Sequence, residues 1–76
     1  MNELKGYQLL ANGIVEQAAK DYRELLKRPY HTLTSKEKWE KIKIERFFRS
    51  DWFELLTNVD GEMLMKRLTE EVNNDR

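Results

Sequence analysis

The chain of 76 residues contains no cysteine, one histidine, one proline and three glycines. Without cysteine it can form neither a disulfide nor a thiolate zinc site, and a single histidine excludes a pair of histidine ligands. A domain this short buries only about 60% of the surface that its unfolded chain exposes. Small domains often gain stability from disulfides, metals or partners. The composition therefore leaves self-association or a protein partner as the open route.

The chain also lacks an apolar run of the roughly 18 to 20 residues that a membrane span needs. Its first residues, MNELKGYQLLANG, contain no basic segment followed by an apolar one, so we expect no signal peptide. These absences predict a soluble intracellular protein without a membrane partner.

The residues that are abundant, chiefly Glu, Lys, Leu, Ala, Gln and Arg, are good helix formers. No stretch alternates between apolar and polar residues for long enough to indicate a strand. We therefore predict an all-α fold, a small bundle of three to four helices. It forms a single domain over residues 1–76, with frayed ends at 1–6 and 73–76. The expected helices span residues 8–28, 35–49, 51–57 and 61–72.

The first expected helix carries a continuous apolar stripe. Its members recur at the i, i+3, i+4 and i+7 spacing of one helix face; they are Tyr7, Leu10, Ala11, Ile14, Val15, Ala18, Tyr22, Leu25 and Leu26. Asn12-Gly13 is a weak point, because Asn is a good N-cap and Gly costs about 1 kcal/mol inside a helix. A helix that begins at residue 13, after a separate turn or a kinked extension, is therefore the alternative. Pro29 ends the helix.

Residues 47–53, FFRSDWF, place four aromatic rings within seven residues. On one continuous helix these rings would point in four directions, which a small bundle cannot bury. If Ser50 is an N-cap, the first two rings end one helix and the other two belong to the next. The sequence thus favours a folded corner of the core over a binding patch, and a long uninterrupted helix is the alternative. Thr34 with Glu37 forms a capping box for the preceding helix, and Asp60 is a plausible N-cap for the last one.

The second expected helix has apolar side chains on two sides. At 100° per residue, Ile44, Phe47 and Phe48 lie on one side, with Trp39 and Ile42 nearly opposite. The pattern favours a central helix with neighbours on both sides. In the other interpretation, Trp39 anchors a contact with a partner or a second copy, because aromatic and Arg side chains carry most interface energy. The partner-binding residues would then be Trp39, Ile42, Arg46 and Arg49.

Charge is unevenly distributed, although the net charge is zero: residues 27–49 carry eight basic and three acidic groups, and residues 50–76 carry three and seven. The second helix is thus a candidate for binding nucleic-acid phosphates. Its candidate residues are Lys36, Lys38, Lys41, Lys43, Arg46 and Arg49. The lysines spread around the helix axis, which favours a solvated charged helix instead. A helix-turn-helix that uses residues 61–72 for recognition is disfavoured, because acids outnumber bases on its outward face.

We predict no catalytic, cofactor-binding or metal-binding residue. The chain has no cysteine nucleophile and no glycine-rich phosphate loop, and His31 lies near Pro29 in an expected loop, where a solvated histidine is typical. Asp60 and Glu62 look like cap and first-turn acids, and the alternating acidic ligands of a calcium loop are missing. We therefore expect a protein that is no enzyme, needs no cofactor and takes no small-molecule substrate.

Several short strings resemble a known group of proteins. In chain order they are IVEQA at 14–18, DYR at 21–23, ERFFRS at 45–50 with WF at 52–53, LT at 56–57 and DG at 60–61. Over about residues 12–72 this order resembles short, uncharacterised proteins encoded by phages and prophages of Gram-positive bacteria. The resemblance implies no catalytic residue. It implies an accessory factor in the cytoplasm of a bacterial host cell, which binds a host or phage protein or regulates transcription or packaging.

Together these observations predict a small, non-enzymatic, phage-type accessory protein. It is expected to bind a protein partner, or to self-associate, through a helical surface. The alternative is a nucleic-acid-binding regulator that uses the basic second helix.

Overall fold

The computed structural model describes the backbone of residues 3–74 and the side chains of residues 13–74. The described part is all-α and contains no strand, so the predicted fold class is confirmed. The elements are α1 (Glu3–Leu26), a short 3₁₀ helix η1 (Tyr30–Thr32), α2 (Ser35–Phe48), α3 (Asp51–Leu56) and α4 (Gly61–Asn74).

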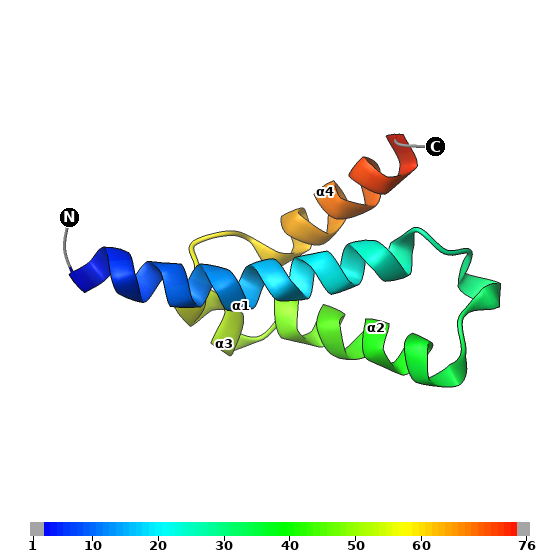
Figure 1. The fold of residues 1–76 in the computed structure, drawn as a ribbon, viewed down its shortest axis with the longest axis horizontal. Helices are drawn as coiled ribbons and strands as arrows, with labels where there is room; N and C mark the ends of the chain where they lie inside the picture. Colours follow the sequence, from blue (N-terminus) through cyan, green and yellow to red (C-terminus); the bar gives the residue numbers. More distant parts are fainter. Residues whose placement is uncertain (1–2, 75–76) are drawn as a thin grey trace.

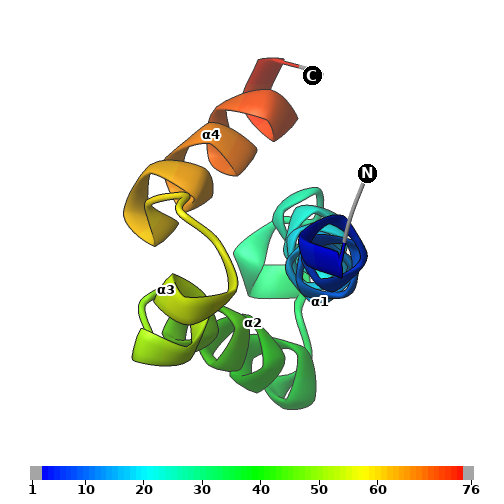
Figure 2. The same cartoon turned by 90° about the vertical axis from the view of Figure 1, so that its left-hand side faces the viewer.

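The helix α1 forms the long axis of the molecule, and α2 returns beside it in the opposite direction (Figure 1). The helix α4 crosses α1 on another side, while the short α3 turns away from the end of α2 (Figures 1 and 2). Among residues 3–74, no helix combines the length and the apolar character that a bilayer crossing requires.

The helix α1 differs from its expected bounds at both ends. It runs without a break through Asn12-Gly13, so a start at residue 13 is wrong. Once a helix has formed, each further residue adds a hydrogen bond, and a single Gly does not stop this propagation. The helix ends at Leu26, two residues earlier than expected, because Pro29 disfavours the helical conformation in the residue before it. Residues 3–6 and 73–74, where we expected fraying, are helical, and residues 1–2 and 75–76 lie outside the described part.

Two helix starts agree with the expected capping residues. The Glu37 N–H donates to Thr34 Oγ1 at 3.1 Å and the Thr34 N–H donates to Glu37 Oε1 at 2.9 Å, which is the capping box of α2. Asp60 Oδ1 accepts from the N–H groups of Glu62 and Met63 at 2.9 and 3.3 Å. The side chains of Thr34 and Asp60 therefore fix where α2 and α4 begin.

The FFRSDWF stretch is a folded corner, as the sequence favoured. Ser50 Oγ accepts from the Phe53 N–H at 3.1 Å and donates to the Phe47 carbonyl at 2.6 Å, so one hydroxyl joins the end of α2 to the start of α3. The rings of Phe48 and Phe53 are fully buried, with centroids 5.5 Å apart in an edge-to-face arrangement. Trp52 belongs to the same stretch but is not buried, since 56% of its surface is exposed.

The corner forms the centre of the hydrophobic core. The buried residues of the core cluster come from all four α-helices; they are Ala19, Tyr22, Phe48, Phe53, Met65 and Leu68. Edge-to-face aromatic contacts of this kind contribute about 0.5–1.5 kcal/mol beyond the area that they bury. On α4, Met65, Leu68 and Val72 form the buried side of the helix.

Gly61, the first residue of α4, lies directly on the backbone of α2. A Cβ atom added at Gly61 would lie 1.8 Å from the carbonyl oxygen of Phe48 and 2.7 Å from its carbonyl carbon. Backbone atoms at the end of a helix cannot move aside as a flexible side chain can. Gly61 is therefore required for close approach, a role that its position after Asp60 in the sequence did not reveal.

Replacing Ser50 by Ala should lower the free energy of unfolding by about 1–2 kcal/mol, because an N-cap side chain is lost. Urea titration followed by circular dichroism measures this change. Ser35→Ala is the matched control, since Ser35 is exposed at the first position of α2 and makes no side-chain hydrogen bond in the described structure. Equal stabilities of the two variants would contradict the capping role of Ser50.

Replacing Gly61 by Ala should destabilise the protein by more than the Ser50 variant, because the added methyl group would overlap the backbone of Phe48. In the first turn of an exposed helix the same change is normally neutral or stabilising. Thermal unfolding of Gly61→Ala and Gly13→Ala, which adds a methyl group where nothing lies within 4 Å, gives a matched comparison. A stabilising Gly61→Ala change would show that α4 does not pack on α2 in this way.

Candidate functional site

The residues predicted to bind a partner lie on the side of α2 that points away from the rest of the protein. We call Trp39, Ile42, Arg46 and Arg49 the outer face of α2. Trp39 is 50% exposed and Ile42 is 38% exposed, so the prediction of a central α2 with neighbours on both sides is wrong. The reason is the corner, since Phe48 is buried against the other helices and they cover only that side of α2.

Within the outer face, Arg46 and Trp39 contact each other. The guanidinium carbon of Arg46 lies 5.5 Å from the centroid of the Trp39 ring, which is a cation–π distance. The two residues are seven positions apart, two turns along the same side of the helix. The indole ring and the guanidinium group therefore form one exposed unit.

Arg49 lies at the edge of the outer face and is already paired. Its Nε donates to Glu62 Oε1 in α4, and this hydrogen bond raises the pKa of the Arg49 guanidinium. The pair is exposed, so it is worth little to stability. It nevertheless reduces the charge that Arg49 can offer to a partner.

The structure divides the six basic residues proposed for nucleic-acid binding. Lys41 faces α1, where its Nζ donates to Glu45 Oε2 at 2.9 Å and lies 5.5 Å from the Tyr22 ring centroid. Lys38 Nζ lies 4.9 Å from the centroid of the Tyr30 ring, next to η1. Lys41 is therefore part of the contact between α1 and α2 and is no longer a candidate for binding nucleic acid.

The other five bases share the outer half of α2. At 100° per residue they fall within an arc of about 160°, and the three glutamates of the helix lie outside that arc. These bases are Lys36, Lys38, Lys43, Arg46 and Arg49. The outer half of α2 thus carries charge of one sign, except where Glu62 of α4 reaches Arg49.

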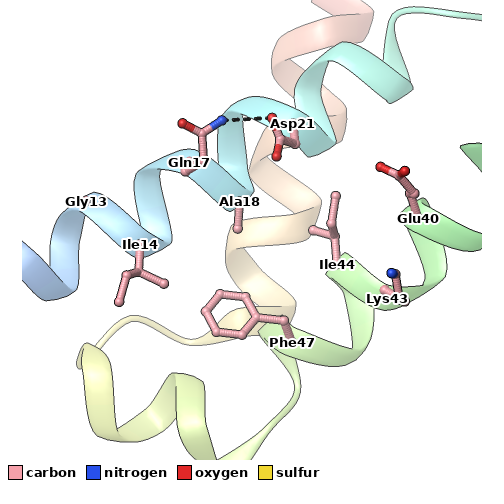
Figure 3. Close-up of a pocket in the computed structure, with 9 residues that line it drawn as sticks. All are labelled: Gly13, Ile14, Gln17, Ala18, Asp21, Glu40, Lys43, Ile44 and Phe47. Carbon is pink, nitrogen blue, oxygen red and sulfur yellow. Dashed lines mark hydrogen bonds between the residues drawn. The ribbon is translucent and has the colours of Figure 1, made fainter.

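A second surface, a groove of about 660 Å³, lies between α1 and α2 (Figure 3). Its apolar floor consists of Ile14 and Ala18 from α1 and Ile44 and Phe47 from α2. Ile14 is 47% exposed, although the sequence placed it in the core stripe. Helical periodicity could not reveal this exposure, because it does not show how much of an apolar stripe the neighbouring helices cover.

The rim of the groove is polar. Gln17 and Asp21 line it on α1, and Glu40 and Lys43 line it on α2. The Gln17 amide donates to Asp21 Oδ1 at 2.9 Å. Figure 3 shows Asp21 and Glu40 on opposite walls, toward the end of the groove that lies away from Ile14. Within the described part of the chain, neither carboxylate forms an ion pair.

The walls of the groove are held together by a partly buried polar contact. The Tyr22 hydroxyl donates to Glu45 Oε2 at 2.8 Å, and the same oxygen accepts from Lys41. Burial by itself raises the pKa of the Glu45 carboxyl, but the hydrogen bonds from Lys41 and Tyr22 outweigh burial and hold its pKa below its ordinary value. Burial and the bond to Glu45 raise the pKa of the Tyr22 phenol. The ionised Glu45 therefore joins α1 to α2.

Neither surface offers obvious reaction chemistry. Among the described residues, no three His, Asp or Glu side chains lie close enough together to hold a metal ion. His31 is exposed in η1, as expected for a loop histidine. What the two surfaces offer is apolar area bordered by charge, which suits binding.

Comparison of the chain with protein-family models, curated proteins and solved structures found no match. The resemblance to phage-encoded proteins therefore stays a prediction. The function has to be argued from the surfaces themselves.

The Glu45 contact predicts how stability depends on pH. Because folding lowers the pKa of Glu45, its contribution is complete above about pH 4.3, the ordinary Glu value, and is lost as the pH falls through the lower, folded-state pKa. Replacing Glu45 by Gln should therefore lower stability at pH 7 and make stability depend less on pH between about pH 5 and 3.

Urea unfolding at a series of pH values measures this effect. Glu40→Gln is the matched control, because Glu40 is an exposed acid of the same helix without an ion pair in the described structure. It should keep the pH dependence of the unsubstituted chain. If Glu45→Gln also keeps it, the ionised Glu45 does not stabilise the contact between α1 and α2.

Proposed function

We propose that the protein is a non-enzymatic protein-binding module that contacts its partner through the outer face of α2. The observation that carries the proposal is the half-exposed Trp39 ring, which lies outside a core already filled by other aromatic side chains. Exposed apolar patches on small proteins often mark interaction sites. Covering the Trp39 ring and Ile42 would remove apolar surface from water, worth about 25 cal/mol for each Å².

The contact between Arg46 and Trp39 supports the same proposal. Trp and Arg are the residues most enriched where interface energy is concentrated. Ordering a long side chain on binding costs about 0.5–1.5 kcal/mol. Because Arg46 already lies over the Trp39 ring, part of that cost is met before a partner arrives.

The charge around Trp39 indicates the chemistry of the partner. Arg46 belongs to the outer face and Lys36 and Lys43 border it, and at 100° per residue no glutamate of α2 lies on that side. A complementary partner would present a pocket for the indole ring, with Asp or Glu side chains at its edge. The phage-type resemblance suggests a host or phage protein in the bacterial cytoplasm as this partner. In self-association, a second copy of the chain would take the place of that partner.

A nucleic-acid-binding regulator is the second candidate, because five bases share the outer half of α2. An exposed Trp among bases could stack on an unpaired nucleotide base, as in proteins that bind single strands. The proposal favours protein because Glu62 pairs with Arg49 and the lysines remain spread over a wide arc. Salt distinguishes the candidates, since phosphate contacts weaken steeply with ionic strength and an apolar contact does not.

Trp39→Ala should weaken partner capture and leave the fold intact. The tagged chain is incubated with lysate of a bacterial host, with and without nuclease, at low and high salt. We expect one protein to be retained after nuclease treatment and its affinity to fall about 30-fold or more in the variant, as for an interface residue worth about 2 kcal/mol. Trp52→Ala is the matched control, an equally exposed Trp on α3.

Three results would contradict the proposal. Loss of helicity in Trp39→Ala would mean that Trp39 stabilises the fold. Equal capture by the Trp39 and Trp52 variants would place the contact elsewhere. Capture that disappears with nuclease and high salt would transfer the function to nucleic acid.

A further inference from the structure

The groove between α1 and α2 is distinct from the outer face of α2, and we propose that it binds an amphipathic helix of a partner protein. The bound helix would place its apolar side chains on Ile14, Ala18, Ile44 and Phe47. It would carry a Lys or Arg at the end that lies between Asp21 and Glu40. This proposal goes beyond contact through Trp39 and does not depend on it.

The dimensions of the groove fit about two turns of helix. Its wall on α1 runs from Gly13 to Asp21, about 12 Å at 1.5 Å per residue, and its wall on α2 runs from Glu40 to Phe47, about 10 Å. A helix of that length presents apolar side chains at i, i+3 or i+4, and i+7 to one side. The apolar floor offers two positions on each wall to receive them.

The chemistry of the floor favours a helix over other occupants. The floor residues have no side-chain polar atom, so a small polar molecule would find no group there to fix its orientation. A peptide that binds as an added strand needs free N–H and C=O groups along a strand edge, which two helices do not provide. A helix satisfies its own backbone hydrogen bonds and can cover an apolar floor without cost to its polar groups.

Gly13 is a second, independent observation. Apart from its chain neighbours and the backbone of its own helix, nothing lies within 4 Å of the position where its Cβ would be, and its φ is not positive, so the described fold does not require glycine there. An alanine would stabilise the interior of α1. Gly13 lines the groove, and a missing side chain at that point lets the backbone of a second helix approach closely.

The charge of the rim indicates the chemical class of the bound helix and the end of the groove at which its basic residue lies. Asp21 and Glu40 come from opposite walls and lie toward the same end, while Lys43 is the one base among the described residues of the rim. A cation between the two carboxylates would gain from both, whereas an acidic residue there would be repelled. The basic end of the bound helix is therefore expected at Asp21 and Glu40.

A displayed library of 14-residue helical peptides tests the proposal on the full chain. Four stripe positions vary among Ala, Leu, Ile, Met and Phe, and both ends vary among Lys, Gln and Glu. Selection should enrich peptides with a complete apolar stripe and Lys at one end. Their affinity should fall at least tenfold in Ile14→Glu, and the Asp21→Lys/Glu40→Lys variant should prefer Glu at that end instead.

Two further variants separate the groove from the rest of the molecule. Gly13→Ala should raise the midpoint of thermal unfolding and yet weaken the selected peptides about tenfold, a combination that damage to the fold cannot produce. Leu55→Glu, a change at a highly exposed apolar residue of α3, should leave affinity unchanged. Trp39→Ala should also leave it unchanged, whether or not Trp39 contacts a partner.

Three results would overturn the proposal. The first is a selection that enriches no peptide, or one whose peptides bind Ile14→Glu and the charge-reversed variant with the same affinity as the original chain. The second is loss of peptide binding in Trp39→Ala, which would make the groove and the outer face one surface. The third is a dimer in analytical ultracentrifugation that Ile14→Glu converts to monomer, which would make a second copy the occupant.

Discussion

The close contact between Gly61 and the backbone of Phe48 is the constraint on which the arrangement of the helices depends. Ser50 ends one helix and caps the next, and the chain then reverses so that α4 begins on the last residue of α2. Two phenylalanine rings fill the space inside this double turn. Because the turn gathers α1, α3 and α4 on one side of α2, the opposite side of α2 has no neighbour in the described structure.

One-sided packing of α2 explains why a chain of this size keeps so much apolar surface. The buried side of α2 supplies part of the core, and exposed apolar residues remain on its outer face around Trp39 and in the groove beside Ile44. The two surfaces differ in charge, since bases border the first and two carboxylates flank one end of the second. The outer face therefore suits an acidic partner, and the groove suits a helix with a basic end. In our proposals the protein can bind both partners, because the two surfaces lie on different sides of α2.

Local signals in the sequence predicted most of the fold. The caps at Thr34, Ser50 and Asp60 were predictable because each depends on a side chain and a backbone N–H two or three residues away. The positions that depend on tertiary contact were not. Gly13 and Gly61 have the same side chain, yet one lies against open space and the other against backbone, and only the folded chain distinguishes them.

The candidate site was predictable only in part, for the same reason. The sequence showed that α2 has apolar residues on two sides, but the choice between a central and a peripheral helix depends on how the neighbours are placed. The groove was missed because helical periodicity assigns Ile14 and Phe47 to inner stripes without saying how much of each stripe a neighbour covers.

A cysteine scan of α2 tests most directly the claim that this helix is buried on one side only. The chain has no cysteine of its own, so single substitutions can be labelled one at a time with a maleimide. The account predicts fast labelling at positions 39, 42, 43 and 46, intermediate labelling at 44 and 47, and protection at 48. Protection at 39 and 42 equal to that at 48 would mean that α2 is a central helix, and the outer face would then not exist.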